Sequence, residues 1–120
     1  MSHSAHARYL VGIDLGTTHT VVAYTCLDGS VAAVPQLFPI EQSTRPGEVT
    51  AKPLLPSVRY QAEPAELTPS DRALPWSAND DGTHEASAWV VGEWARDLGA
   101  RTPGRLIVSA KSWLSHDGVD

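Results

Sequence analysis

The pattern of hydrophobic and polar positions divides the chain into a strand-rich start, a proline-rich middle and a partly helical end. Two apolar runs, 9–16 and 18–25, have the composition of strands, and the link between them is too short for a crossover. They are therefore predicted to form an antiparallel hairpin. Asp28-Gly29 matches the two-residue turn of a second hairpin, which leads into a third strand over 30–34.

Proline dominates the middle of the chain, where eight of the nine prolines fall between residues 35 and 75. Such spacing excludes a long helix and restricts strands to short, edge-like pieces. One short strand is predicted over 54–60. Residues 61–87 are polar and have little periodicity, and Asp80-Asp81-Gly82 forms a clear turn signal, so we expect an exposed loop there.

Strand character returns at 87–92, and a helix is predicted over 92–100 because apolar residues recur four apart, with Gly99 as a C-terminal stop. A second helical face is predicted over 104–115, although an Ile-Val pair leaves its first turn ambiguous. That face is formed by Leu106, Ala110, Trp113 and Leu114.

Composition narrows the function classes. A length of 120 residues with 42% hydrophobic residues suits one domain, and a net charge of −5 argues against nucleic acid as a partner. The single cysteine, Cys26, excludes an intramolecular disulfide framework. No apolar run is long enough to cross a bilayer, and the first residues lack the apolar core of a signal peptide. The sequence therefore predicts a cytoplasmic chain with no membrane partner.

One carboxylate stands out, because Asp14 lies within the apolar run 9–16. A buried carboxylate costs several kcal/mol, roughly, unless a cation or hydrogen-bond donors satisfy it. Gly16 permits close approach of a ligand to the backbone, and Thr17 and Thr18 add hydroxyl and N–H groups that can hold phosphate. An aspartate on the preceding strand can hold phosphate-bound Mg²⁺ through water. Because it joins strand to strand, this turn is neither a Walker loop nor a dinucleotide-binding fingerprint.

Three segments carry a family resemblance. "GIDLGTT" resembles the first phosphate motif of the actin-like ATPase superfamily, most closely that of the 70 kDa (DnaK-type) heat-shock chaperones. Residues 54–60 resemble that family's Thr-Pro-Ser strand, and 91–115 resemble its Val-Gly to Ala-Lys-x-Leu segment. The three occur in family order. Compared with typical members, the chain carries irregular insertions at about 36–53 and 61–87.

The resemblance implies an α/β fold, namely the first lobe of an actin-like ATPase (ribonuclease H-like) domain, with antiparallel hairpins followed by mixed strand and helices. Residues 1–120 would be a partial nucleotide-binding domain whose cofactors are ATP or ADP and Mg²⁺. In the parent protein, hydrolysis would be coupled to the binding of unfolded peptides and co-chaperones. The residues it implies for catalysis are Lys111, at the γ-phosphate, and Asp14, which also holds Mg²⁺ through water; those it implies for nucleotide binding are Gly16, Thr17, Thr18 and His19.

Two observations qualify this assignment. Lys111 is one of only two lysines in the chain, which is consistent with a site role, whereas His19 stands where the family more often has Tyr or Asn. Plainer interpretations remain open: a simple hairpin turn at Asp14–Gly16, threonines chosen for strand propensity, and a solvated Lys111.

Three functions follow from the sequence: a DnaK-like chaperone ATPase, a sugar-kinase-type phosphotransferase of the same superfamily, and a non-catalytic interaction module. The chain shows no second Gly-rich phosphate motif, no candidate catalytic glutamate and no adenosine motif. Because nucleotide in this superfamily sits between two lobes, we expect this chain by itself to be catalytically inactive.

Overall fold

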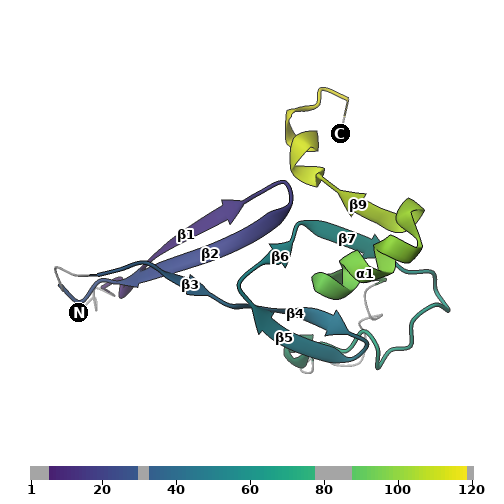
Figure 1. Cartoon of the computed structure of the whole chain (residues 1–120), viewed down its shortest axis with the longest axis horizontal. Helices are drawn as coiled ribbons and strands as arrows, with labels where there is room; N and C mark the ends of the chain where they lie inside the picture. Colours follow the sequence, from purple (N-terminus) through teal and green to yellow (C-terminus); the bar gives the residue numbers. More distant parts are fainter. Residues whose placement is uncertain (1–5, 30–32, 78–87, 119–120) are drawn as a thin grey trace, which may run out of the picture.

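The computed structural model describes residues 6–29, 33–77 and 88–118. The chain is mixed α/β, with three antiparallel sheets and few helices in the described residues (Figure 1). This agrees with the predicted α/β class. Across the described residues, no helix is both long enough and apolar enough to cross a membrane.

The first sheet is built on the predicted hairpin. Strand β1 (Tyr9–Leu15) pairs with β2 (His19–Cys26) in an unbroken antiparallel register from Tyr9 opposite Cys26 to Leu15 opposite Thr20. Two short strands, β3 (Gln36–Phe38) and β6 (Leu55–Pro56), pair antiparallel with β2. The hairpin prediction is therefore confirmed.

The predicted third strand over 30–34 is wrong where it can be tested. Ala33 and Val34 are not in a strand, and residues 30–32 lie outside the described residues. The next strand along the chain is β3, which begins at Gln36 and pairs with β2. Side-chain contacts explain this position. The Phe38 ring packs edge-on against Tyr24, with centroids 6.2 Å apart, and the Tyr24 hydroxyl donates to Gln36 Oε1 at 3.1 Å.

A second hairpin occupies the region expected to be an irregular insertion at 36–53. Strand β4 (Ile40–Arg45) pairs with β5 (Glu48–Lys52), and Pro46-Gly47 makes the turn, with Gly47 at a φ of 68°. Proline presets the first turn position and glycine adopts positive φ without steric cost, so this dipeptide favours a turn. The prediction of short strands does hold, because β4, with 6 residues, is the longest described strand between residues 35 and 75.

The core lies between the third sheet and the helix. Strand β7 (Val58–Gln61) pairs antiparallel with β8 (Trp89–Val91) and β9 (Leu106–Val108), and α1 (Glu93–Arg101) packs against all three. Figure 1 shows α1 beside β7. The buried hydrophobic side chains are Tyr60, Ala62, Val90, Trp94 and Ala95.

The end of the chain differs from the predicted helix over 104–115. Residues 106–108 are strand β9, and only Ala110–Ser115 is helical, as the 3₁₀ helix η3. The branched run Leu-Ile-Val fits either structure by periodicity, and pairing with β7 selects the strand. Two further 3₁₀ turns are η1 (Pro75–Ser77) and η2 (Pro103–Arg105).

Gly99 is also not a helix stop, since it is buried inside α1. A Cβ atom there would lie 2.4 Å from Leu106 Cδ2, so the missing side chain lets β9 approach the helix. The exposed loop predicted over 61–87 is wrong at its start, because Gln61 ends β7 and Ala62 is buried in the core. It is confirmed for 63–77, where the described residues form turns and the short η1, while 78–87 lie outside the described residues.

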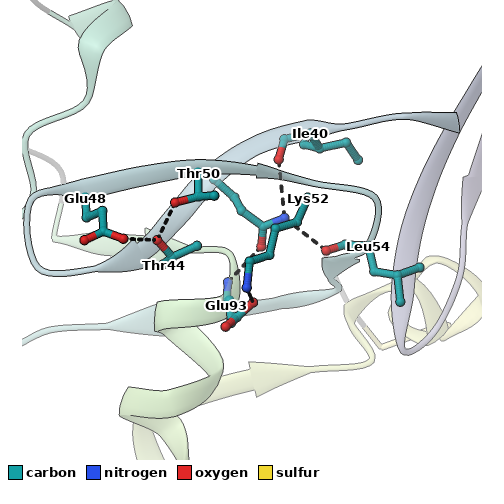
Figure 2. A network of polar contacts seen from close by, with 8 residues as sticks. Ile40, Thr44, Glu48, Thr50, Lys52, Leu54 and Glu93 are labelled. Atoms are coloured by element: carbon teal, nitrogen blue, oxygen red, sulfur yellow. Dashed lines mark hydrogen bonds and ion pairs between the residues drawn. The ribbon is translucent and has the colours of Figure 1, made fainter.

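A buried glutamine joins the β4–β5 hairpin to the helix. Gln42 is 3% exposed, its Oε1 accepts from the Glu93 backbone N–H at 3.0 Å, and its Nε2 donates to the Leu54 carbonyl at 3.0 Å. Lys52 Nζ contacts Glu93 Oε2 at 2.7 Å, and Figure 2 shows these two side chains pointing toward one another. The β4–β5 hairpin therefore provides the acceptor for the backbone N–H of Glu93, the first residue of α1. The N-cap residue of the helix, Gly92, makes no side-chain capping hydrogen bond.

The first sheet is exposed by comparison. Every residue of β1 is exposed, including the apolar side chains of Tyr9, Val11, Ile13 and Leu15, which alternate along one face. A ladder of edge-on rings crosses the sheet from Tyr9 to Tyr24 to Phe38. Strand pairing and these rings hold the hairpin together more than burial does.

Replacing Gly92 with alanine should destabilise the chain. Gly92 has a φ of 105°, and an added Cβ would lie 2.8 Å from the Ser43 carbonyl oxygen. Combined backbone strain and clash should lower the free energy of unfolding by about 1–3 kcal/mol, measured by urea denaturation. Gly104→Ala is the matched control, because an added Cβ there meets nothing within 4 Å. Equal stability of the two variants would contradict the constraint at Gly92.

The Lys52–Glu93 ion pair should give an acid-dependent stability. The hydrogen bond from Lys52 holds the pKa of Glu93 below its ordinary value. A lowered carboxyl pKa stabilises the fold above the ordinary pKa, and that stability is lost as the pH falls through the folded value. Lys52→Met should therefore be less stable than the parent at pH 7, and the difference should shrink by about pH 3, in urea denaturation at both values.

Lys111→Met is the control for that measurement, because it removes the same charge from a side chain that makes no ion pair with a described residue. A constant difference between Lys52→Met and the parent at both pH values would show that packing, and not the ion pair, is responsible.

Candidate functional site

The turn between β1 and β2 contains the predicted phosphate motif and depends on Gly16. A Cβ atom at Gly16 would lie 2.4 Å from the His19 carbonyl oxygen, which is backbone and cannot move aside freely. The sequence motif suggested that this glycine admits a ligand. The structure adds a second reason, since the turn's own backbone passes too close for any larger residue.

A distant segment braces this turn. Ser57 Oγ donates to the Gly16 carbonyl at 2.8 Å, and the Ser57 backbone N–H donates to the Thr18 carbonyl at 2.9 Å. Thr20 Oγ1 lies 3.1 Å from Ser57 Oγ, completing a hydroxyl pair. In addition, β6 pairs His19 with Pro56. Sequence reasoning identified the segment 54–60 as a motif but assigned Ser57 no role.

Lys111 approaches the turn from the other end of the chain. It follows β9 and a residue in the left-handed conformation, Ser109 with a φ of 54°, and lies exposed on η3. An open pocket of about 500 Å³ brings together polar and charged residues with apolar side chains of β6, β7, β9 and η3. The residues of the first kind and the glycine are Gly16, Thr17, Thr20, Ser57, Arg59, Ser109 and Lys111. The pocket thus brings two parts of the turn and the candidate lysine together.

The other three predicted site residues do not line this pocket. Thr18 is exposed, and His19 is half-buried where β2 meets β6. Asp14 is exposed near the end of β1, opposite Val21. Since successive side chains of a strand point to opposite faces, Asp14 and the pocket-lining Leu15 leave β1 on different sides. The apolar run therefore does not bury Asp14, and its charge needs no buried partner.

Metal-ligating side chains do not cluster in the part of the chain that the structure describes. There, no group of three or more His, Cys, Asp or Glu residues is positioned to hold a metal ion. A single carboxylate such as Asp14 fits a different mode, in which Mg²⁺ is held by ligand phosphates and water.

Comparison with known proteins adds no family assignment to this chain. No family model, curated protein or solved structure matches it. The basis for a function is therefore the sequence motifs and the pocket that they share.

Gly16→Ala should distort the turn, because its Cβ meets backbone. We expect a loss of about 1–3 kcal/mol in the free energy of unfolding and shifted NMR signals for Thr17 and Thr18. Gly12→Ala is the matched control in the same hairpin, since an added Cβ at Gly12 meets nothing within 4 Å. That variant should be as stable as the parent or gain roughly 0.5–1 kcal/mol, as alanine for glycine does in a strand. The reverse order of stabilities would refute the close contact.

Proposed function

We propose that this chain is the first-lobe part of the nucleotide-binding domain of a DnaK-like chaperone ATPase, in the actin-like ATPase superfamily. The observation that carries the proposal is the shared pocket. Gly16 and Thr17, near the start of the sequence, and Lys111, near its end, line the same cavity of about 500 Å³. The three segments that resemble the family meet around this cavity, since residues of 54–60 line it as well.

The chemistry of these groups suits a triphosphate. Lys111 provides a compact point charge on a flexible stem, which can follow a transferring phosphoryl group as its charge redistributes. The turn provides backbone N–H groups and the hydroxyl of Thr17, which can bind phosphate oxygens in the pocket, whereas Thr18 lies outside the pocket lining. In phosphoryl transfer the protein's contribution is almost entirely positioning and electrostatic stabilisation, so such a set of groups is sufficient in kind.

Mg²⁺ belongs to this proposal as the partner of the phosphates. Asp14, an exposed carboxylate two residues before Gly16, does not line the pocket, so it would act on Mg²⁺ only through the water that the ion keeps. When bound, the ion neutralises charge on the phosphate oxygens. His19 is half-buried after the turn and does not line the pocket, so we assign it no contact with the phosphates.

The described site is open, so the chain by itself should bind nucleotide weakly and turn it over at no measurable rate. Tight small-molecule sites bury most of their ligand, and the groups proposed here would contact only the phosphate end. In the parent protein, we propose that a second lobe supplies the remaining contacts and that hydrolysis controls the binding of unfolded peptides.

The test is an NMR titration of the 120-residue chain with Mg-ATP, with adenosine as the ligand that lacks phosphate. We expect saturable shifts at Gly16, Thr17 and Lys111 with Mg-ATP and none with adenosine. Lys111→Met and Asp14→Asn should each weaken binding by about tenfold, the size of one charge-assisted contact. Phosphate release should stay at the background rate.

Arg101→Gln is the control, since it removes a positive charge from an exposed residue at the end of α1 that does not line the pocket. Unchanged affinity in Lys111→Met would remove this lysine from the phosphate site. Absence of any binding by the parent chain, or equal shifts with adenosine, would reject phosphate recognition by this turn.

A further inference from the structure

Ser57 makes three hydrogen-bonding contacts, two with the turn between β1 and β2 and one with the start of β2. Its hydroxyl donates to the Gly16 carbonyl at 2.8 Å and lies 3.1 Å from the Thr20 hydroxyl, and its backbone N–H donates to the Thr18 carbonyl at 2.9 Å. These contacts span about forty residues of sequence. They therefore tie the turn to a separate segment of the chain, which hydrogen bonds within the turn itself cannot do.

The geometry points to Ser57 as the positioning residue of the phosphate turn, an inference that rests on the proposed function. A phosphate-binding turn works only if its N–H groups have fixed directions and its carbonyl oxygens, which repel an anion, are occupied elsewhere. Ser57 occupies two of those carbonyls. Because each peptide group is planar and trans, fixing the Gly16 and Thr18 carbonyls also fixes the N–H groups of Thr17 and His19, which point the opposite way.

The surroundings of the turn make this restraint necessary. Thr17 and Thr18 are exposed, and β1, which leads into the turn, is exposed along its whole length. Burial therefore contributes little to the shape of the turn. Ser57, by contrast, lies between Pro56, which is buried, and Val58, the first residue of β7. The serine thus connects an exposed hairpin turn to the sheet that carries the core.

Ser57→Val and Ser57→Thr form an isosteric pair that tests the hydroxyl alone. We expect Ser57→Thr to bind Mg-ATP like the parent and Ser57→Val to bind about tenfold more weakly. In the absence of nucleotide, the ¹⁵N order parameters of Thr17 and Thr18 should fall from about 0.85 to below about 0.6 in Ser57→Val and stay high in Ser57→Thr. Ser57→Ala repeats the loss with a smaller side chain, in case valine perturbs the fold.

Thr50→Val is the control for loss of a hydroxyl remote from the turn, since Thr50 pairs with Thr44 in the β4–β5 hairpin. Parent-like affinity in both Ser57→Val and Ser57→Ala would overturn the role of Ser57 and leave the proposed function standing. Weaker binding with unchanged order parameters would also overturn it, because Ser57 would then act on the ligand directly. If the parent chain binds no Mg-ATP, the proposed function and this inference fail together.

Discussion

The buried amide of Gln42 is the interaction on which the arrangement of the described elements depends. One end of the amide accepts from the first backbone N–H of α1, and the other donates to the Leu54 carbonyl just before β6. Leaving this buried amide without one of its partners would cost about 1–3 kcal/mol of folding free energy, so the fold strongly favours both contacts. Three pieces of chain that are distant in sequence are thereby held in one place: the β4–β5 hairpin, the helix and the approach to β6.

This bridge has a consequence for the phosphate turn. Strand β6 begins one residue after Leu54, pairs with the start of β2 and leads directly into Ser57. The position of Ser57 is therefore set from one side by the Gln42 contact and from the other by β7, whose Tyr60 is fully buried. The rigid part of the molecule, the core between α1 and the third sheet, reaches the exposed first sheet through this short stretch. A turn on a sheet that buries little of its own surface can keep a defined shape only through such contacts.

The sequence predicted the elements whose signal is local and missed those whose signal depends on position or on distant partners. The β1–β2 hairpin follows from two apolar runs with a short link and α1 from helical spacing, and both are present. The number of prolines between residues 35 and 75 does not predict the β4–β5 hairpin, because their positions decide whether a strand can form. Pro39 and Pro53 in fact flank the hairpin and Pro46 lies in its turn, so none interrupts a ladder. Strand β9 was missed because a three-residue branched run fits two periodicities, and only its pairing with β7 distinguishes them.

The candidate site shows the same division. Gly16 and Thr17 could be identified from a five-residue motif, because the turn is contiguous in sequence. That Lys111 lines the same pocket as the turn could not be derived from spacing, since it requires β9 to pair with β7 and Ser109 to adopt a left-handed conformation before η3. The role of Ser57 is even harder to predict, because a serine between two short strands follows no special sequence pattern. Its role depends on its hydrogen bonds to two backbone carbonyls of another segment. A sequence motif thus identifies the groups that can face a ligand. The residues that fix the positions of those groups can be identified only from the folded structure.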